Sequence, residues 1–260
     1  TTALPIAFLF YRAWGETVAE FTDAAHTAAA LGLRVYLGPA YRTGNQVVDD
    51  DGTIGTSYDE PRGLAELAEA IRFCERMEGS ANGLVRTMLS PDRIETCTPE
   101  LLRRTAAAGR ALGVPVRQHA CRSKIEYDLV LQQHGMSPPE WLASLGYLNE
   151  RTLLLHATYV SGARHIDRPG RDLEIIRDSG ATIVHCPLVS GRGGGAIDHF
   201  GRYKAMGLKL AMGTDTAPPD MVANMQTGMI LARVLAGSVA AVRSEDYYDA
   251  ATLGGADALA

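Results

Sequence analysis

Residues 208–216 read Leu-Lys-Leu-Ala-Met-Gly-Thr-Asp-Thr, and the interpretation of the whole chain starts from this stretch. An apolar strand is expected at residues 208–212, and it leads through Gly213 to the carboxylate of Asp215. In parallel α/β folds the carboxyl ends of the strands meet at one edge, where these folds build their sites. Taken alone, Asp215 would more readily be interpreted as the cap of the next helix. Three upstream strands that end in histidine favour the site.

Histidine follows three further expected strands: His119 comes after residues 114–118, His156 after 152–155, and His185 after 181–184. These histidines and Asp215 recur at intervals of about 30 residues, the length of a βα unit. Consecutive units should therefore bring the four side chains to one rim. Imidazole and carboxylate are the ligands of catalytic zinc. Each histidine alone would be interpreted as a packing residue, but four coincident positions favour metal chemistry.

Strands and helices alternate along the chain. The helices are expected to stop at Gly32, Gly113, Gly180 and Gly207, and each stop is followed by an apolar strand. Seven strands, the first at residues 3–11, predict an α/β fold with a parallel sheet covered by helices, in one domain over residues 1–260. Seven strands do not close the eight-stranded barrel. Either the sheet is open or one barrel strand lies outside the given residues, and we favour the second. Residues 42–62, rich in Gly, Asp and Thr, are expected to form a long loop without a hairpin.

Composition excludes several classes of protein. The 260 residues are 46% hydrophobic and 21% charged, with a net charge of -5, and contain no aromatic-interleaved basic stripe that would favour nucleic acid. No apolar run reaches the roughly 18 residues of a membrane span, and there is no signal-peptide pattern. The chain begins without Met inside an expected strand, so we expect its start to be cut.

The four cysteines are widely spaced and form no C-x-x-C pair, which favours reduced thiols in a cytoplasm. The H-x-E…P-C-x-x-C pattern of one zinc deaminase class is absent. The expected partner is a small-molecule substrate, and a homodimer is left open.

Four short motifs carry a resemblance to a known family: Gln-His-Ala at 118–120, Leu-Leu-His-Ala at 154–157, Val-His-Cys-Pro at 184–187 and Gly-Thr-Asp at 213–215. Their order resembles that of the amidohydrolase superfamily, above all its aminohydrolase and chlorohydrolase branch, which includes guanine and cytosine deaminases and triazine hydrolases. The resemblance implies a (β/α)8 TIM-type barrel with one divalent metal ion, zinc in the first place or iron.

The resemblance also implies roles for individual residues. His119 matches a metal ligand on strand five, and Asp215 matches the strand-eight aspartate that is both a metal ligand and a proton acceptor. His156 matches the strand-six histidine that touches the hydrolytic water or the substrate. His185 matches a recurring strand-seven position, which we assign to substrate binding.

Two departures from the family pattern stand out. No H-x-H occurs in this sequence, although the family's strand one supplies two metal ligands with that motif. Strand one and the outer β-sandwich are therefore expected to be missing, and the barrel is expected to be truncated at both ends and inactive by itself. Deaminases of the branch often carry Glu three residues after the strand-five histidine, whereas here that residue is Arg122. Arginine cannot shuttle a proton at neutral pH but can hold an anionic or carbonyl group, so Arg122 is assigned to substrate binding.

The leading hypothesis is a metal-dependent hydrolase that breaks a C–N bond of a small nitrogen-containing heterocycle, by deamination or amide-type hydrolysis. Metal-activated water attacks an electrophilic carbon, Asp215 takes its proton and passes it to the leaving group, and His156 polarises the intermediate. The alternatives are a C–Cl hydrolase of the same branch and a non-catalytic barrel remnant that only binds a ligand.

Overall fold

The computed structural model describes residues 2–5, 15–197, 200–215 and 217–259. It divides into two compact units, residues 1–118 and 119–260, and the boundary falls inside strand β8 (Val116–Ala120). Most of the strand expected at residues 3–11 lies outside the described residues, and the described part is β1 (Thr2–Ala3).

The first unit contains a parallel sheet with the strand order β1-β2-β6, where β2 is Arg34–Leu37 and β6 is Val85–Thr87. A second parallel pair joins β3 (Ala40–Tyr41) to β7 (Ser90–Pro91). The helices of this unit are α1 (Val18–Ala30), α2 (Glu60–Met77) and α3 (Pro99–Leu112), with a short 3-10 helix, η2, at Ile94–Thr96. Thr98 caps α3 by accepting the backbone N–H of Leu101, as its position before Pro99 and Glu100 predicts.

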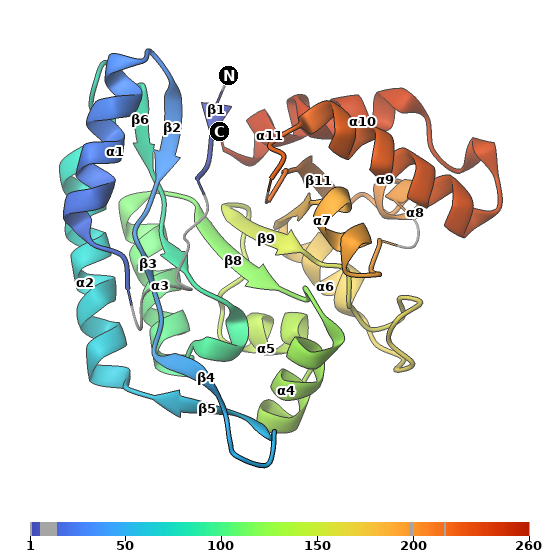
Figure 1. Ribbon diagram of the computed structural model, residues 1–260, viewed down its shortest axis with the longest axis horizontal. Coiled ribbons are helices and arrows are strands. Elements are labelled where there is room, and N and C mark those ends of the chain that lie inside the picture. The colour runs from blue at the N-terminus through green and yellow to red at the C-terminus, as the bar shows by residue number, and fades with distance from the viewer. Residues whose placement is uncertain (1, 6–14, 198–199, 216, 260) are drawn as a thin grey trace. The chain divides into compact units, whose positions relative to one another are not determined.

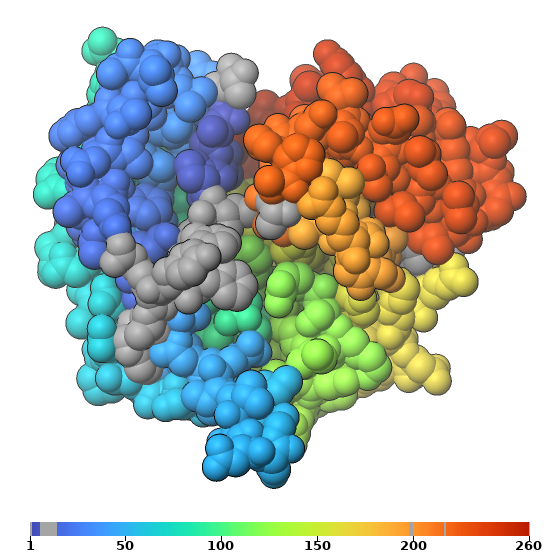
Figure 2. Space-filling view, viewed as in Figure 1, coloured from blue at the N-terminus to red at the C-terminus, as the bar shows by residue number. Residues whose placement is uncertain are grey.

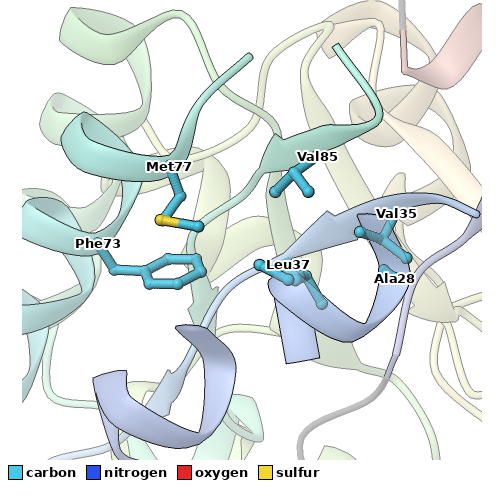
Figure 3. Packing of buried hydrophobic residues seen from close by; sticks show 7 residues of the cluster. Ala28, Val35, Leu37, Phe73, Met77 and Val85 are labelled. Atoms are coloured by element: carbon cyan, nitrogen blue, oxygen red, sulfur yellow. The ribbon is translucent and has the colours of Figure 1, made fainter. Parts of the chain in front are cut away.

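The core of the first unit forms where α1 and α2 pack on β2 and β6 (Figure 3). Apolar residues on one face of each helix meet the inward side chains of the strands, which is the pattern of an amphipathic helix on a buried sheet. The buried cluster consists of Ala25, Ala28, Val35, Leu37, Phe73, Met77 and Val85. Phe73 is fully buried, so its truncation to alanine should cost about 3–5 kcal/mol of unfolding free energy.

The expectation of a long loop at residues 42–62 was wrong, because an antiparallel hairpin lies there. Its strands are β4 (Gly44–Val48) and β5 (Ile54–Tyr58), paired from Gly44 with Tyr58 to Val48 with Ile54. Residues 49–53 form the turn, in which the N–H of Gly52 donates to the carbonyl of Asp49 and Gly52 has φ +84°. The Asp51-Gly52 pair is a hairpin signal. The hairpin lies at the surface of the molecule (Figure 2). Val48 is 69% exposed, and the hairpin strands lack the apolar continuity of the buried ones.

The second unit is built on a sheet with the strand order β11-β10-β9-β8, where β9 is Thr152–His156, β10 is Thr182–His185 and β11 is Lys209–Met212 (Figure 1). Strands β9, β10 and β11 run parallel. Glycine in the left-handed conformation ends two of the helices that lead into strands, at Gly113 before β8 and Gly180 before β10, as predicted. The α/β class with parallel strands is confirmed. Among the described residues the strands form separate sheets, and closure into a (β/α)8 barrel stays a prediction.

The helices of the second unit follow the strands in sequence. They are α4 (Lys124–His134), α5 (Pro138–Ser144), α6 (Asp172–Ser179), α7 (Pro187–Arg192), α8 (Phe200–Ala205), α9 (Met221–Ala236), η3 (Val239–Ala241), α10 (Ser244–Ala251) and α11 (Leu253–Ala258). Within the described ranges no single helix is long and apolar enough to cross a membrane, and only the bent pair Met221–Ala236 and Val239–Ala251 meets the length and composition requirement together.

Candidate active site

Three of the predicted residues come together at the carboxyl ends of β8, β9 and β11. The Nε2 atom of His156 lies 3.9 Å from Oδ2 of Asp215, and the ring centroids of His119 and His156 are 5.5 Å apart. His119 lies near the end of β8, His156 ends β9, and Asp215 follows β11, so three strands of one four-stranded sheet deliver them. The sequence therefore predicted a real cluster of two imidazoles and a carboxylate.

The backbone at these strand ends has an unusual conformation. Among the described residues, six non-glycine residues have positive φ, and four of them are Cys121, His156, Ala157 and Asp215, with φ of 60°, 77°, 44° and 56°. The left-handed region costs an L-residue roughly 1–2 kcal/mol. Strained backbone of this kind collects at functional sites, where the surrounding structure holds it in place. This strain supports the cluster as the candidate site.

Gly213 allows β11 to deliver Asp215 close to β10. Its N–H donates to the carbonyl of His185 at 3.0 Å. A Cβ at this position would lie 3.1 Å from Sγ of Cys186 and 3.3 Å from Cγ1 of Val184. The glycine of the Gly-Thr-Asp motif therefore has a packing reason, because a side chain at residue 213 would crowd the side chains of Cys186 and Val184.

His156 is a buried, neutral imidazole. Its exposed fraction is 2%, and burial followed by the positive charge of Arg122 lowers its pKa to about 3. Neither ring nitrogen has a hydrogen-bond partner among the described residues. An unsatisfied buried polar atom costs about 1–3 kcal/mol, so two on one ring indicate a group held ready for a ligand.

Arg122 follows β8, and a buried carboxylate fixes its backbone. Glu126, which is 1% exposed, accepts the N–H of Cys121 with one oxygen and the N–H of Arg122 with the other, the second at 3.2 Å. Ser123 caps α4 by accepting the N–H of Glu126. The arginine side chain itself is exposed.

His185 is as deeply buried as His156 and lies against two aromatic side chains. It is 2% exposed, and its ring centroid is 5.9 Å from that of Phe200 and 6.4 Å from that of Tyr247. Burial followed by the neighbouring His156 lowers the pKa of His185 to about 3. The aromatic side chains enclose this imidazole, and its assignment to substrate binding stays a prediction.

The cysteines beside the site remain protonated thiols. Burial, followed by the charge of Asp215, raises the pKa of Cys186 to about 12. Burial also raises the pKa of Cys121 well above its ordinary value. Since metals bind the thiolate form, both are read as packing residues rather than metal ligands.

The donor set fits part of a metal site. Two imidazoles and a carboxylate are chemically suited to zinc, and the unpartnered nitrogens of His156 are consistent with such a role. In the part of the chain that the structure describes, however, no three His, Cys, Asp or Glu side chains are arranged to hold an ion. The metal-ligand assignments of His119 and Asp215 therefore stay predictions.

Sequence reasoning missed Glu126, Phe200 and Tyr247. Glu126 had a detectable signal, because Ser123 three residues before it is the pattern of a helix N-terminus. That pattern predicts the helix start but does not reveal that the carboxylate turns back to Cys121 and Arg122. Phe200 and Tyr247 stack with ring centroids 4.2 Å apart, a tertiary contact between residues far apart in sequence.

Comparison with known proteins gives a consistent result. The family model described as "Amidohydrolase family" matches residues 10–260. A 5-methylthioadenosine/S-adenosylhomocysteine deaminase of Natronomonas pharaonis is 27% identical over 249 residues, which are 94% of this chain and 53% of that protein. The chain spans about half the length of the curated relatives it matches.

Two solved structures share the fold. A variant of the atrazine chlorohydrolase from Arthrobacter aurescens TC1, complexed with zinc and atraton, has a TM-score of 0.78 at 19% identity, covering 99% of this chain and 55% of that one. The guanine deaminase from C. acetobutylicum with bound guanine has a TM-score of 0.76 at 17% identity, covering 93% and 56%.

Proposed function

The chain belongs to the amidohydrolase family, and on this premise we propose that it is part of a hydrolase that breaks a C–N bond of a small nitrogen-containing heterocycle. The observation that carries the proposal is the contact between the buried, neutral His156 and Asp215, with His119 beside them. The names of the deaminase relatives indicate that they act on amino-substituted heterocycles, and this supports deamination as the reaction.

The proposed mechanism uses Asp215 and His156 as the catalytic residues. A divalent ion, with zinc as the first candidate and iron as the second, would supply Lewis-acid activation of the hydrolytic water. Asp215 takes a proton from the attacking water and delivers it to the leaving nitrogen, so that a C–O bond forms, the C–N bond breaks and ammonia departs. Attack at the amino-bearing carbon moves an electron pair onto the adjacent ring nitrogen, and His156 donates a hydrogen bond from its neutral ring that polarises this intermediate.

We also propose that residues 1–260 form the barrel domain of this hydrolase. The fold shared with the atrazine chlorohydrolase supports a (β/α)8 arrangement of the parallel strands. His119 and Asp215 are the proposed metal ligands, and Arg122 and His185 face the substrate in this proposal. The four cysteines are free and buried, which supports a cytoplasmic location.

The test is a substrate screen with two separate readouts. The complete protein, of which these 260 residues are proposed to be a part, is supplied with zinc or iron and incubated with heterocyclic amines, amides and chlorides. Ammonia release and chloride release are measured independently. Ammonia release that requires the added ion supports the proposal. Chloride release alone would favour the chlorohydrolase alternative. The observation that supports this alternative is the fold shared with the atrazine chlorohydrolase. Binding without either product would favour a non-catalytic protein.

A further inference from the structure

The segment around Arg122 is tied to the strand that carries His156. The carbonyl of Cys121 accepts the N–H groups of Thr158 and Tyr159, at 3.0 and 2.9 Å. These donors come two and three residues after His156. The backbone immediately before Arg122 is therefore hydrogen-bonded to the segment that follows β9. Together with the two bonds to Glu126, these contacts fix the position from which the arginine side chain extends.

The guanidinium of Arg122 has no acidic partner within the residues that the structure describes. The nearby Lys124 forms an ion pair with Asp128 at 2.6 Å, and Arg168 lies 3.7 Å from the carboxylate of Glu140. Arg122 is therefore an exposed cation on an anchored backbone, whereas these neighbouring cations are paired.

The positive charge of Arg122 reaches the candidate site. It acts on the imidazole of His156, which in turn contacts Asp215. An arginine in this place presents planar N–H donors that match the two oxygens of a carboxylate or the oxygens of a phosphate. The anchoring of its backbone beside the end of β9 and the lack of an acidic partner among the described residues indicate a negatively charged ligand group.

We propose that Arg122 binds an oxyanion of the substrate, so that the substrate of this site is a heterocycle carrying a carboxylate or a phosphate. The reacting carbon lies beside Asp215 and His156, and the oxyanion lies on the side of the site where Arg122 extends from the end of β8. Arg122 is a specificity residue in this arrangement and takes no part in proton transfer. This inference rests on the proposed function, because it names the substrate class of the same site.

The test compares matched ligands that differ by one charged group. Binding of 5-carboxycytosine is measured against cytosine, and cytidine 5′-monophosphate against cytidine, by calorimetry on the 260-residue chain. The variants are Arg122→Gln, Arg122→Lys and, as a control that removes one positive charge from the same segment, Lys124→Gln. Because a charge-assisted hydrogen bond contributes strongly to affinity, Arg122→Gln should weaken the binding of the preferred anionic ligand about 10- to 100-fold. The uncharged partner should change less than about twofold, and Lys124→Gln should behave like wild type.

The two pairs distinguish the sources of the oxyanion. Preference for 5-carboxycytosine assigns a carboxylate, and preference for cytidine 5′-monophosphate assigns a phosphate. Arg122→Lys should retain part of the affinity, because lysine keeps the charge and loses the two-pronged geometry. If neither anionic ligand binds better than its uncharged partner, or if Arg122→Gln weakens both members of a pair alike, the inference is wrong. If binding is charge-selective but no ammonia is released, the inference about Arg122 stands and only the proposed function is contradicted. If uncharged heterocycles are turned over and Arg122→Gln has no effect on that turnover, the proposed function stands and the inference about Arg122 is wrong.

Discussion

The Nε2 atom of His156 lies 3.9 Å from Oδ2 of Asp215, although the two residues belong to different strands and are far apart in sequence. Both residues also have positive φ, at 77° and 56°. The ends of β9 and β11, which lie on either side of β10, thus hold a neutral ring and a carboxylate close together at a backbone cost of roughly 1–2 kcal/mol each. Strained backbone clusters at functional sites, so this arrangement favours a chemical role for Asp215.

Replacing Asp215 by Asn should abolish turnover while the fold survives. Asparagine has nearly the same shape and tolerates a left-handed backbone, but it cannot accept the proton of the attacking water. Loss of a general base lowers the rate by about 100- to 10,000-fold. The measurement is kcat for whichever heterocycle the screen identifies, with urea unfolding of both proteins to compare their stability. Activity within a few fold of wild type would refute the role assigned to Asp215.

Replacing His185 by Phe should flatten the pH dependence of stability. The pKa of His185 is about 3 in the folded protein and 6.5 for an ordinary histidine, so the unfolded chain binds the proton more readily. As far as His185 determines it, the free energy of unfolding is therefore highest above about pH 6.5. It falls as the pH decreases towards 3, by no more than about 1.4 kcal/mol per pH unit.

Phenylalanine keeps a ring against Phe200 and Tyr247 and removes the buried Nδ1, which has no hydrogen-bond partner among the described residues. The variant should therefore be at least as stable as wild type near pH 7. Urea unfolding at pH 7, 6 and 5 measures the difference, which should widen as the pH falls. Parallel stability curves would show that His185 does not remain neutral through burial.

Strand ends were predictable from the sequence, whereas side-chain depth was not. An apolar run followed by His156 or Asp215 has a local pattern, and the βα interval places successive strand ends at one edge. His185 fits the same pattern, yet its enclosure by Phe200 and Tyr247 depends on two helices that only the folded chain brings together. The hairpin at residues 44–58 was missed for a different reason. Its Gly and Asp content is typical of a loop, and it outweighed the turn signal at Asp51 and Gly52.

The 260-residue chain should bind zinc weakly. Zinc sites use three or four protein ligands, and no group of three suitable donors exists in the described portion of the chain. After loading with zinc and dialysis into metal-free buffer, elemental analysis should find well below one ion per chain. A stoichiometric ion that survives dialysis would overturn this prediction and would require ligands beyond His119, His156 and Asp215.

Replacing Glu126 by Gln should destabilise the protein, and a matched change at Glu140 should not. Both glutamates occupy the third position of a helix whose N-cap is serine, Ser123 for α4 and Ser137 for α5. Glu140 accepts the N–H of its own N-cap at 2.8 Å, a contact that glutamine can reproduce. Glu126 instead uses both oxygens, on Cys121 and Arg122, and glutamine offers one oxygen and an N–H₂ group that cannot accept.

One buried N–H would therefore lose its partner in Glu126→Gln, at a cost of about 1–3 kcal/mol. Glu140→Gln keeps the contact with its N-cap and loses only the partly exposed ion pair with Arg168, so it should change the unfolding free energy by less than about 1 kcal/mol. Urea unfolding of the two variants and wild type gives the comparison directly. Because Glu126 fixes the backbone of Arg122, Glu126→Gln should also weaken the charge selectivity of ligand binding, which the Glu140 variant should retain. Equal destabilisation by the two changes would mean that Glu126 acts only as an ordinary helix cap.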